Sequence, residues 1–177
     1  TATAAYVASE IGASNAFGFD ISAACSGFLY GMSTASAFIE SGRYKKIILI
    51  GADKMSSIVD YSDRNTCIIF GDGAGAVLLE PDYEGYGVQD EYLRSNGSNR
   101  NLLRIEAGGS QTPTTKESVE EKKHFIYQDG KNVFKHAVSN MSDASEQIMN
   151  RNNLTPLDVN YLVAHQANKR IIDATSN

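Results

Sequence analysis

Apolar residues follow two different spacings in the first fifty positions. Residues 17–21 and 47–52 are short apolar runs, which are typical of buried strands. Between them, apolar side chains recur at helical spacing: Phe28, Leu29, Met32, Ala35, Phe38 and Ile39. We therefore predict a strand over 17–21, a helix over 25–40 and a strand over 47–52 that is buried on both faces, after a first helix over 4–11. Strand, helix and strand form a βαβ unit, so the pattern predicts an α/β fold with a largely parallel sheet covered by helices.

The rest of the chain continues this alternation with weaker strands. Residues 67–70 and 77–80 are strand-like, 88–106 contain weak strand signals, and 107–123 are polar enough to predict an exposed excursion. A long amphipathic helix is predicted after Asp129-Gly130 and ends at Asn152-Asn153. Thr155-Pro156 is a typical helix start, and the apolar run 160–164 predicts a strand that ends at His165.

The glycine-rich segment 71–76 has the composition of a phosphate-binding loop, but its context argues against that function. A P-loop continues into a helix that begins with Lys and Ser or Thr, whereas Gly75 is followed by a strand-like run. We predict instead a tight glycine turn that lets two backbones pass closely.

Composition narrows the class of protein without identifying it. The 177 residues are 42% hydrophobic and 21% charged, which is ordinary for a soluble globular protein. No run reaches the ~18 apolar residues of a membrane span and no signal peptide opens the chain, so we expect a cytoplasmic protein without membrane association. A net charge of -5 argues against general nucleic-acid binding. Because the chain begins at Thr1 without methionine and ends within a predicted helix, we expect it to be a piece of a longer protein.

Cys25 is the candidate nucleophile. It lies between a predicted strand and a predicted helix, where unsatisfied N–H groups and the positive end of the helix dipole favour a thiolate. Its small neighbours, residues 23–27, leave room for a substrate. The alternative is a small buried side chain, the commonest role of a cysteine, and this is our interpretation of Cys67 within its apolar run. Two cysteines at this spacing predict neither a disulfide framework nor a metal site.

His165 is the candidate partner of Cys25. It ends a predicted strand, and the carboxyl edge of a sheet is where reactive groups gather in α/β folds. A Cys-His pair from distant positions in the sequence is what nucleophilic catalysis needs. A structural histidine that hydrogen-bonds a loop is the alternative. For the other two histidines we expect His124 in solvent and His136 on a helix surface.

Four segments together resemble the β-ketoacyl-acyl carrier protein synthase III family. They are residues 20–28 (Asp-Ile-Ser-Ala-Ala-Cys-Ser-Gly-Phe), 63–64 (Asp-Arg), 70–75 (Phe-Gly-Asp-Gly-Ala-Gly) and 165–172 (His-Gln-Ala-Asn-Lys-Arg-Ile-Ile). The resemblance implies an α/β thiolase-like fold of two similar βαβαβαββ halves in a layered α-β-α-β-α arrangement, here without the first strands and the C-terminal part. It divides the chain into an N-terminal half, residues 1–80, and a C-terminal half, residues 87–177. It also implies a homodimer.

The activity implied by the resemblance is an acyl transfer that starts fatty-acid synthesis and uses no cofactor or metal. Cys25 would accept an acetyl or other short acyl group from acyl-CoA. The acyl enzyme would then condense with malonyl on acyl carrier protein as CO2 leaves. His165 would donate a hydrogen bond to the malonyl thioester oxygen, together with an asparagine beyond Asn177. The length of the acyl primer stays open, because Gln128 stands where the family's primer pocket is often apolar.

Binding residues are carried over by the same resemblance. Arg64 matches an arginine that holds the CoA nucleotide, and Gly130 and Asn168 match positions near the pantetheine arm. Phe70 and Phe134 match residues that line or adjoin the active-site tunnel. Three residues match positions that receive the acidic carrier protein: Lys135, Gln166 and Arg170. A local basic patch would let a chain of net charge -5 bind an anionic partner, although ordinary solvated charge is the alternative.

Three further functions stay open beside a synthase III. The first is a relative with the same Cys-His-Asn chemistry that makes a secondary metabolite, and turnover with free malonyl-CoA would favour it. The second is a non-catalytic thiolase-fold subunit that binds acyl-CoA or a protein. The presence of both Cys25 and His165 counts against it, since a silent subunit needs neither. The third is a cysteine hydrolase, which the lack of any local protease signature disfavours.

Overall fold

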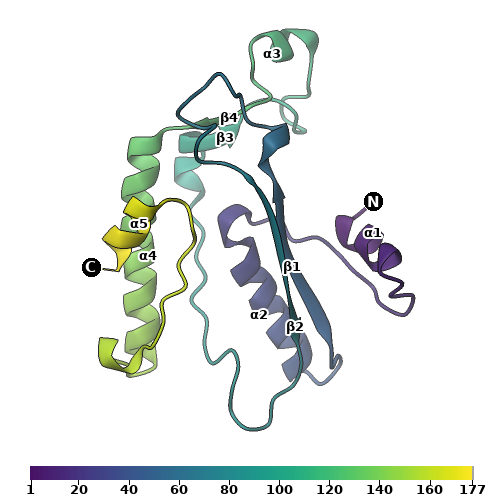
Figure 1. The fold of residues 1–177 in the computed structure, drawn as a ribbon, viewed down its shortest axis with the longest axis vertical. Helices are drawn as coiled ribbons and strands as arrows, with labels where there is room; N and C mark the ends of the chain where they lie inside the picture. Colours follow the sequence, from purple (N-terminus) through teal and green to yellow (C-terminus); the bar gives the residue numbers. More distant parts are fainter. Residues whose placement is uncertain (177) are drawn as a thin grey trace. The chain divides into compact units, whose positions relative to one another are not determined.

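A computed structural model describes residues 1–176, which fall into two compact units. The first unit comprises residues 1–51 and 76–87, and the second comprises residues 52–75 and those from 88 onward. Figure 1 labels the helices and strands of both. The predicted division into halves at residues 80–87 stays a prediction. The halves are defined by repeated topology, whereas these units are defined by compactness.

The first helix, α1 (Thr3–Glu10), is capped by a distant side chain. The backbone N–H groups of Thr3 and Ala4 donate to the two carboxylate oxygens of Asp20 at 2.7 and 2.8 Å. The bonds from Ala4 and then Thr3 hold the pKa of Asp20 below its ordinary value. The helix predicted over 4–11 is confirmed, and Asp20 ties the segment before Cys25 to it.

Residues 17–21 do not form the predicted strand. No ladder of backbone hydrogen bonds joins them to another segment within the part of the chain that is described, and a strand exists only where such a partner is present. Aromatic rings hold the segment instead. The ring centroid of Phe17 lies 5.3 Å from that of Tyr44, and the centroid of Phe19 lies 6.3 Å from that of Phe38.

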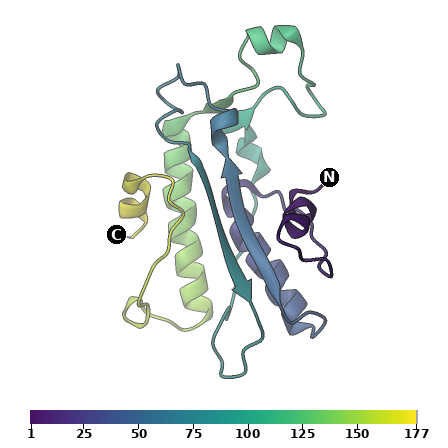
Figure 2. The same cartoon turned by 45° about the vertical axis from the view of Figure 1, so that its right-hand side comes forward.

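The helix predicted over 25–40 and the strand predicted over 47–52 are both confirmed. A single 3₁₀ turn, η1 (Ala24–Ser26), leads into α2 (Gly27–Glu40), which runs along β1 (Ile47–Lys54) in Figures 1 and 2. The contact is close, because a Cβ atom at Gly31 would overlap the side chain of Leu49.

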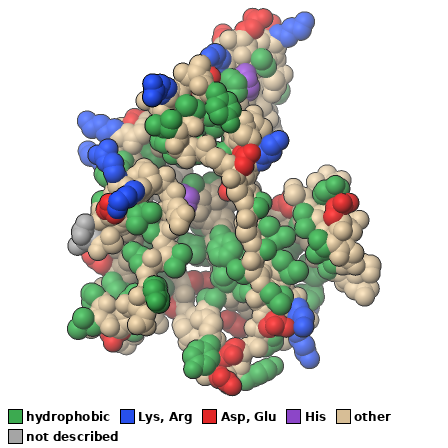
Figure 3. All heavy atoms as spheres, in the orientation of Figure 1, with side chains coloured by type: hydrophobic (Ala, Val, Ile, Leu, Met, Phe, Trp, Pro, Cys, Tyr) green, Lys and Arg blue, Asp and Glu red, His purple; other side chains and the backbone are tan. Residues whose placement is uncertain are grey.

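Only one face of β1 is covered. Ile47 and Leu49 are half-buried, whereas Ile48 and Ile50 are 55% and 43% exposed. Alternate side chains of a strand point to opposite faces, and α2 packs on one of them. The predicted burial on both faces is therefore wrong for the described residues. Figure 3 likewise shows hydrophobic side chains that reach the surface in many places.

The glycine-rich segment belongs to a strand, β2 (Asp72–Leu79), that pairs with β1. Figure 2 shows the two strands running in opposite directions. The predicted βαβ unit joined residues 17–21 to 47–52, and its parallel pairing is absent from the described residues because 17–21 form no strand. The predicted glycine turn is wrong as well. A Cβ atom at Gly73 or Gly75 would meet nothing within 4 Å, so close approach of another backbone does not explain these glycines. The strand continues past Gly75 without a helix, which agrees with the rejection of a P-loop.

The second unit contains the long helix predicted after residue 129, α4 (Gly130–Arg151). It follows a short antiparallel sheet in which β3 (Leu103–Ile105) pairs with β4 (Ile126–Gln128). The last helix, α5 (Lys169–Thr175), lies against α4 in Figures 1 and 2. The contact between α4 and α5 brings residues from two distant parts of the sequence together.

Two strands predicted for the second unit are absent. Residues 67–70 form turns in which the N–H of Cys67 donates to the carbonyl of Asp63, and the N–H of Phe70 to that of Thr66. Residues 160–164 have no regular structure, and Val163 is 93% exposed. An apolar run predicts a strand from composition alone, whereas a strand also needs a neighbouring backbone. Neither run has such a neighbour among the described residues.

The predicted excursion 107–123 is more ordered than its composition indicates. It contains α3 (Lys116–Glu120), which Thr115 begins with a reciprocal capping box to Ser118. Ala107 and Ser118 are both buried. Short 3₁₀ turns complete the chain: η2 (Met55–Ser57), η3 (Gly97–Leu102) and η4 (Pro156–Asp158). No helix within residues 1–176 is both long and apolar enough to cross a bilayer.

Candidate active site

Cys25 lies on a sharp turn in the first unit. It is the middle residue of η1 and directly precedes Ser26, the N-cap of α2, and its side chain is exposed. The preceding residue, Ala24, has a φ of +46°, in the left-handed region that non-glycine residues rarely adopt. The backbone therefore changes direction abruptly just before the thiol, which presents the side chain at the surface.

The N-terminus of α2 is not closed by a capping side chain. Ser26 makes no side-chain hydrogen bond to the first turn, and this turn contains no acidic residue. The N–H of Gly27, the first residue of α2, donates to the Ala24 carbonyl, and the positive end of the helix dipole can still stabilise negative charge next to Cys25. A thiolate and the oxyanion of a tetrahedral intermediate are both charges of this kind.

Arg64 lies in a turn that the side chain of Asp63 organises. Asp63 Oδ1 accepts a hydrogen bond from the N–H of Asn65 at 3.0 Å, and its Oδ2 accepts one from the hydroxyl of Thr66 at 3.0 Å. These bonds, that of Asn65 first, hold the pKa of Asp63 below its ordinary value. Thr66 is 1% exposed, so the turn is anchored in the interior. Arg64 itself is exposed, and Phe70 is half-buried at the end of the same segment.

Several predicted binding residues meet where α5 contacts α4. Gly130 is the first residue of α4, and Phe134 lies one turn further along. The guanidinium carbon of Arg170 is 5.7 Å from the centre of the Phe134 ring, which is a cation–π distance. Asn168 caps α5, because its Oδ1 accepts a hydrogen bond from the N–H of Ile171 at 3.0 Å. The structure therefore brings together a predicted tunnel residue and a predicted carrier-docking residue.

The remaining predicted residues are exposed near this contact. His165 and Gln166 lie on the segment that leads into α5, where the N–H of Ala167 donates to the His165 carbonyl at 3.0 Å. Lys135 is exposed on α4. The pairing of His165 with Cys25 stays a prediction, because the two residues belong to different compact units.

The other histidines give one confirmed prediction and one wrong one. His136 is exposed on α4, with its Nε2 3.4 Å from Nδ2 of Asn99. His124 is not in solvent. It is half-buried, its ring centroid lies 4.0 Å from that of Phe125, and its Nδ1 is buried without a hydrogen-bond partner in the described structure. The packing of two adjacent rings overrides the polar character of the surrounding sequence.

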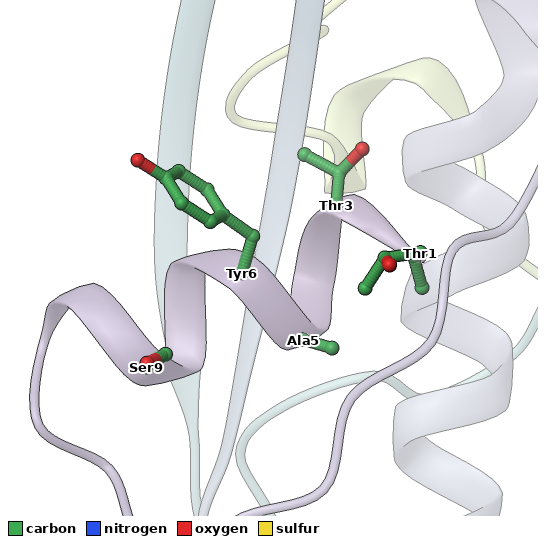
Figure 4. Close-up of a pocket in the computed structure, with 6 residues that line it drawn as sticks. Thr1, Thr3, Ala5, Tyr6 and Ser9 are labelled. Carbon is green, nitrogen blue, oxygen red and sulfur yellow. The ribbon is translucent and has the colours of Figure 1, made fainter.

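A hollow elsewhere on the surface carries no comparable chemistry. It lies beside α1 and is lined by Thr1, Ala2, Thr3, Ala5, Tyr6 and Ser9. Figure 4 shows that the labelled side chains all come from α1 or the residues just before it. None of the predicted site residues lines the hollow. Across residues 1–176, no group of three or more His, Cys, Asp and Glu side chains is placed to hold a metal ion.

The sequence is similar to known proteins along nearly its whole length. Residues 19–97 match the family described as 3-oxoacyl-(acyl-carrier-protein) synthase III. The beta-ketoacyl-(acyl-carrier-protein) synthase III of Chlorobium phaeobacteroides is 55% identical over 177 residues, which cover 99% of this chain and 54% of that protein. The chain thus spans about half the length of the curated relatives it matches.

Solved structures share the fold. The crystal structure of 3-oxoacyl-(acyl carrier protein) synthase III from Pseudomonas aeruginosa has a TM-score of 0.88 and 34% identity, over 99% of this chain and 54% of that one. A priming beta-ketosynthase of a polyketide biosynthetic pathway has a TM-score of 0.83 and 34% identity, over 96% and 50% of the two chains. These likenesses confirm the predicted α/β thiolase-like fold and the resemblance drawn from the four segments.

Proposed function

Because the chain shares the sequence segments and the fold of the β-ketoacyl-acyl carrier protein synthase III family, we propose that the protein containing it starts fatty-acid synthesis. It would condense an acetyl or short acyl group from acyl-CoA with malonyl on acyl carrier protein. The observation that carries the proposal is the Cys25 turn. An exposed thiol directly precedes a helix whose N-terminus has no capping side chain.

In the first half-reaction, the thiolate of Cys25 attacks the carbonyl carbon of the acyl-CoA thioester. A new C–S bond forms, the bond to the CoA sulfur breaks, and the leaving thiolate takes up the proton that Cys25 gave up. The positive end of the α2 dipole stabilises the oxyanion that forms between these steps. The product is an acyl thioester on Cys25 and free CoA.

In the second half-reaction, malonyl on the carrier protein loses its carboxylate as CO2. The electron pair of the broken C–C bond passes into an enolate, whose carbon attacks the acyl carbonyl, and Cys25 leaves as a thiolate. His165 donates a hydrogen bond to the thioester oxygen as the enolate charge develops. This role rests on the resemblance and on the exposure of His165 just before α5.

The two substrates engage different groups of residues in this proposal. Arg64 holds the CoA nucleotide, and Gly130 and Asn168 adjoin the pantetheine arm. The carrier protein docks on Lys135, Gln166 and Arg170. The contact of Arg170 with Phe134 supports a route from the docking surface into the tunnel, in which Phe70 also takes part. We further propose a cytoplasmic homodimer that needs no cofactor, since acyl-CoA and malonyl-carrier protein are its substrates.

One comparison favours a second candidate function. The similarity to a priming beta-ketosynthase of a polyketide pathway is as high in identity, at 34%, as that to the Pseudomonas aeruginosa synthase III. A condensing enzyme of secondary metabolism would keep the Cys25 chemistry and differ in its acceptor.

The experiment that tests these proposals supplies the full-length protein with acetyl-CoA and one of two acceptors, malonyl-acyl carrier protein or malonyl-CoA. Mass spectrometry of the acceptor identifies the product. Acetoacetyl-carrier protein formed far faster than acetoacetyl-CoA supports the synthase III. Preferred turnover of malonyl-CoA supports the second candidate. A protein that condenses neither, and whose Cys25 is never acylated, contradicts both and points to a non-catalytic subunit.

A further inference from the structure

A side-chain clamp joins the excursion 107–123 to the turn that carries Arg64. Lys122 Nζ donates to Asp60 Oδ2 at 2.7 Å and to Ser62 Oγ at 2.9 Å. We call these three residues the Lys122 clamp. Its members on the Arg64 side, Asp60 and Ser62, precede Arg64 by four and two positions. The backbone adds a second connection, in which the N–H of Ile126 donates to the Ile58 carbonyl at 2.8 Å.

Lys122 occupies a backbone position at which glycine is favoured. Its φ is +59°, and it follows Glu121, the C-cap of α3. Its N–H donates to the Val119 carbonyl at 3.0 Å, and the N–H of Lys123 donates to the Ser118 carbonyl at 2.9 Å. These two bonds define a Schellman helix end, whose left-handed residue is usually glycine. Lysine is conformationally unfavourable at this position, but unlike glycine it has a side chain that contacts Asp60 and Ser62.

Asp60 connects the clamp to the turn itself. Its Oδ1 accepts hydrogen bonds from the N–H and the hydroxyl of Ser62 at 2.8 and 2.6 Å, while its Oδ2 binds Lys122. Lys122 and then Ser62 lower the pKa of Asp60 to about 2, so the carboxylate is charged at neutral pH. The Asp60 carbonyl accepts a hydrogen bond from the N–H of Asp63 at 2.9 Å, and Asp63 organises the turn that holds Arg64. The chain of contacts therefore runs from Lys122 through Asp60 and Asp63 to the backbone of Arg64.

We propose that Lys122 and Asp60 are positioning residues for the nucleotide of acyl-CoA, because the clamp fixes the turn from which Arg64 extends. The inference rests on the proposed function, and in particular on Arg64 as the residue that holds the nucleotide. The two residues act through the turn and touch no reacting atom. Their loss weakens recognition of the nucleotide and leaves the chemistry at Cys25 intact.

The test compares two acyl donors with the full-length protein. Acetyl-CoA carries the nucleotide, whereas acetyl-N-acetylcysteamine is a thioester without it. Lys122→Gly removes the amine and places the favoured residue at the positive φ, so the variant folds. We expect its KM for acetyl-CoA to rise about threefold to tenfold with little change in kcat, as for the loss of a binding contact. Its kcat/KM for acetyl-N-acetylcysteamine should equal that of the wild type.

Two further variants sharpen the result. Asp60→Asn should give the same donor-dependent rise in KM, and the double variant should be no worse than the more affected single one, because both remove one interaction. Lys46→Met is the matched control. It breaks an exposed ion pair with Glu80 at 3.1 Å and should leave both donors unaffected.

An unchanged KM for acetyl-CoA in Lys122→Gly, or an equal loss with both donors, overturns the inference. A wild-type protein that neither donor acylates overturns the proposed function as well. This outcome is distinguishable from failure of the inference alone, because it is measured on the wild type without any variant.

Discussion

The N-terminus of α2 and those of α4 and α5 differ in how their backbone donors are used. Asp129 accepts a hydrogen bond from the N–H of Asn132 at 3.2 Å at the start of α4, and Asn168 caps α5. At the start of α2, Ser26 makes no such bond, and an exposed cysteine precedes it. Capping side chains stabilise a helix end, whereas an end without one leaves the positive end of the helix dipole for an anion. The difference supports the proposal that the N-terminus of α2 takes part in the reaction of Cys25.

The two regions also differ in how the preceding chain is held. Before α2, the backbone adopts a rare conformation at Ala24, and the aromatic contacts of Phe17 and Phe19 and the bonds of Asp20 to α1 secure the segment. Before α4 and α5, the caps themselves fix the turn. A strained turn persists only when its surroundings determine it, so we expect the Cys25 turn to be sensitive to substitutions that the other helix ends tolerate.

The largest effect should follow from closing the N-terminus of α2. Ser26→Asp places a carboxylate where it can accept the first-turn N–H groups and adds a negative charge beside Cys25. Both changes disfavour the thiolate, so acylation by acetyl-CoA should slow about tenfold to a hundredfold. Single-turnover acylation followed by intact mass measures the rate. Ser26→Ala is the control. If Ser26→Asp were acylated at the same rate, the lack of a capping side chain at this helix end would have no role in the reactivity of Cys25.

The next effect is expected at Ala24. A β-branched side chain is strongly disfavoured at a φ of +46°, so Ala24→Val should displace Cys25 and slow acylation by about tenfold. Ala24→Gly relieves the strain and should keep the rate near that of the wild type. The same single-turnover assay compares the two variants. Equal rates in both would show that this conformation does not position the thiol.

An effect of similar size, but confined to one half-reaction, is expected on the other side of the comparison. Arg170→Glu reverses a charge on α5 and removes the contact with Phe134. It should weaken the use of malonyl-carrier protein about tenfold, because like charges would then meet at the proposed docking surface. Acylation by acetyl-CoA should change much less. Equal losses in the two half-reactions, measured separately, would defeat the docking assignment.

A modest loss of stability should follow from removing the cap of α5. Asn168→Ala leaves the N–H of Ile171 without its acceptor and should lower the free energy of unfolding by about 1 kcal/mol. Asn168→Asp keeps an acceptor and should restore most of it. Urea unfolding measures both variants. If Asn168→Asp restores stability but not turnover, Asn168 has a role in the site beyond capping.

The smallest effect concerns pH. The pKa of Asp20 is lowered by its bonds from Ala4 and Thr3, so its contribution to stability is fully present above the unfolded pKa and disappears as pH falls through the lower folded value. Asp20→Asn should therefore be less stable than the wild type near neutral pH and equal to it in strong acid. Thermal unfolding at several pH values tests this. A difference that persists unchanged below the folded pKa would mean that Asp20 does not act through its charge.

Local sequence patterns predicted the helices well. The periodicity over 25–40 gave α2, and the helix expected after Asp129-Gly130 is α4, with Asn152 as its C-cap. A helix satisfies its own backbone hydrogen bonds, so its own residues largely determine whether it forms. The runs 17–21, 67–70 and 160–164 failed as strands because a strand depends on a partner that its own residues do not specify.

The sequence placed Cys25 at a helix start, which the structure confirms, and the family resemblance assigned Arg64. The catalytic role of Cys25 and the binding role of Arg64 stay predictions. The clamp between Lys122 and Asp60 was not predictable, because 62 positions separate the two residues and no local pattern connects them. The close approach of Gly31 to Leu49 was invisible for the same reason, since it is set by tertiary packing. The positive φ of Ala24 had no signal in the sequence, because alanine rarely adopts that conformation.

The most direct test of the central claim is the intact mass of the full-length protein after incubation with acetyl-CoA and longer acyl-CoAs. We predict a gain of one acyl group that is absent in Cys25→Ser, and the acyl groups accepted would define the primer preference. No gain from any acyl-CoA in the folded protein, or a gain that persists in Cys25→Ser, would contradict Cys25 as the nucleophile.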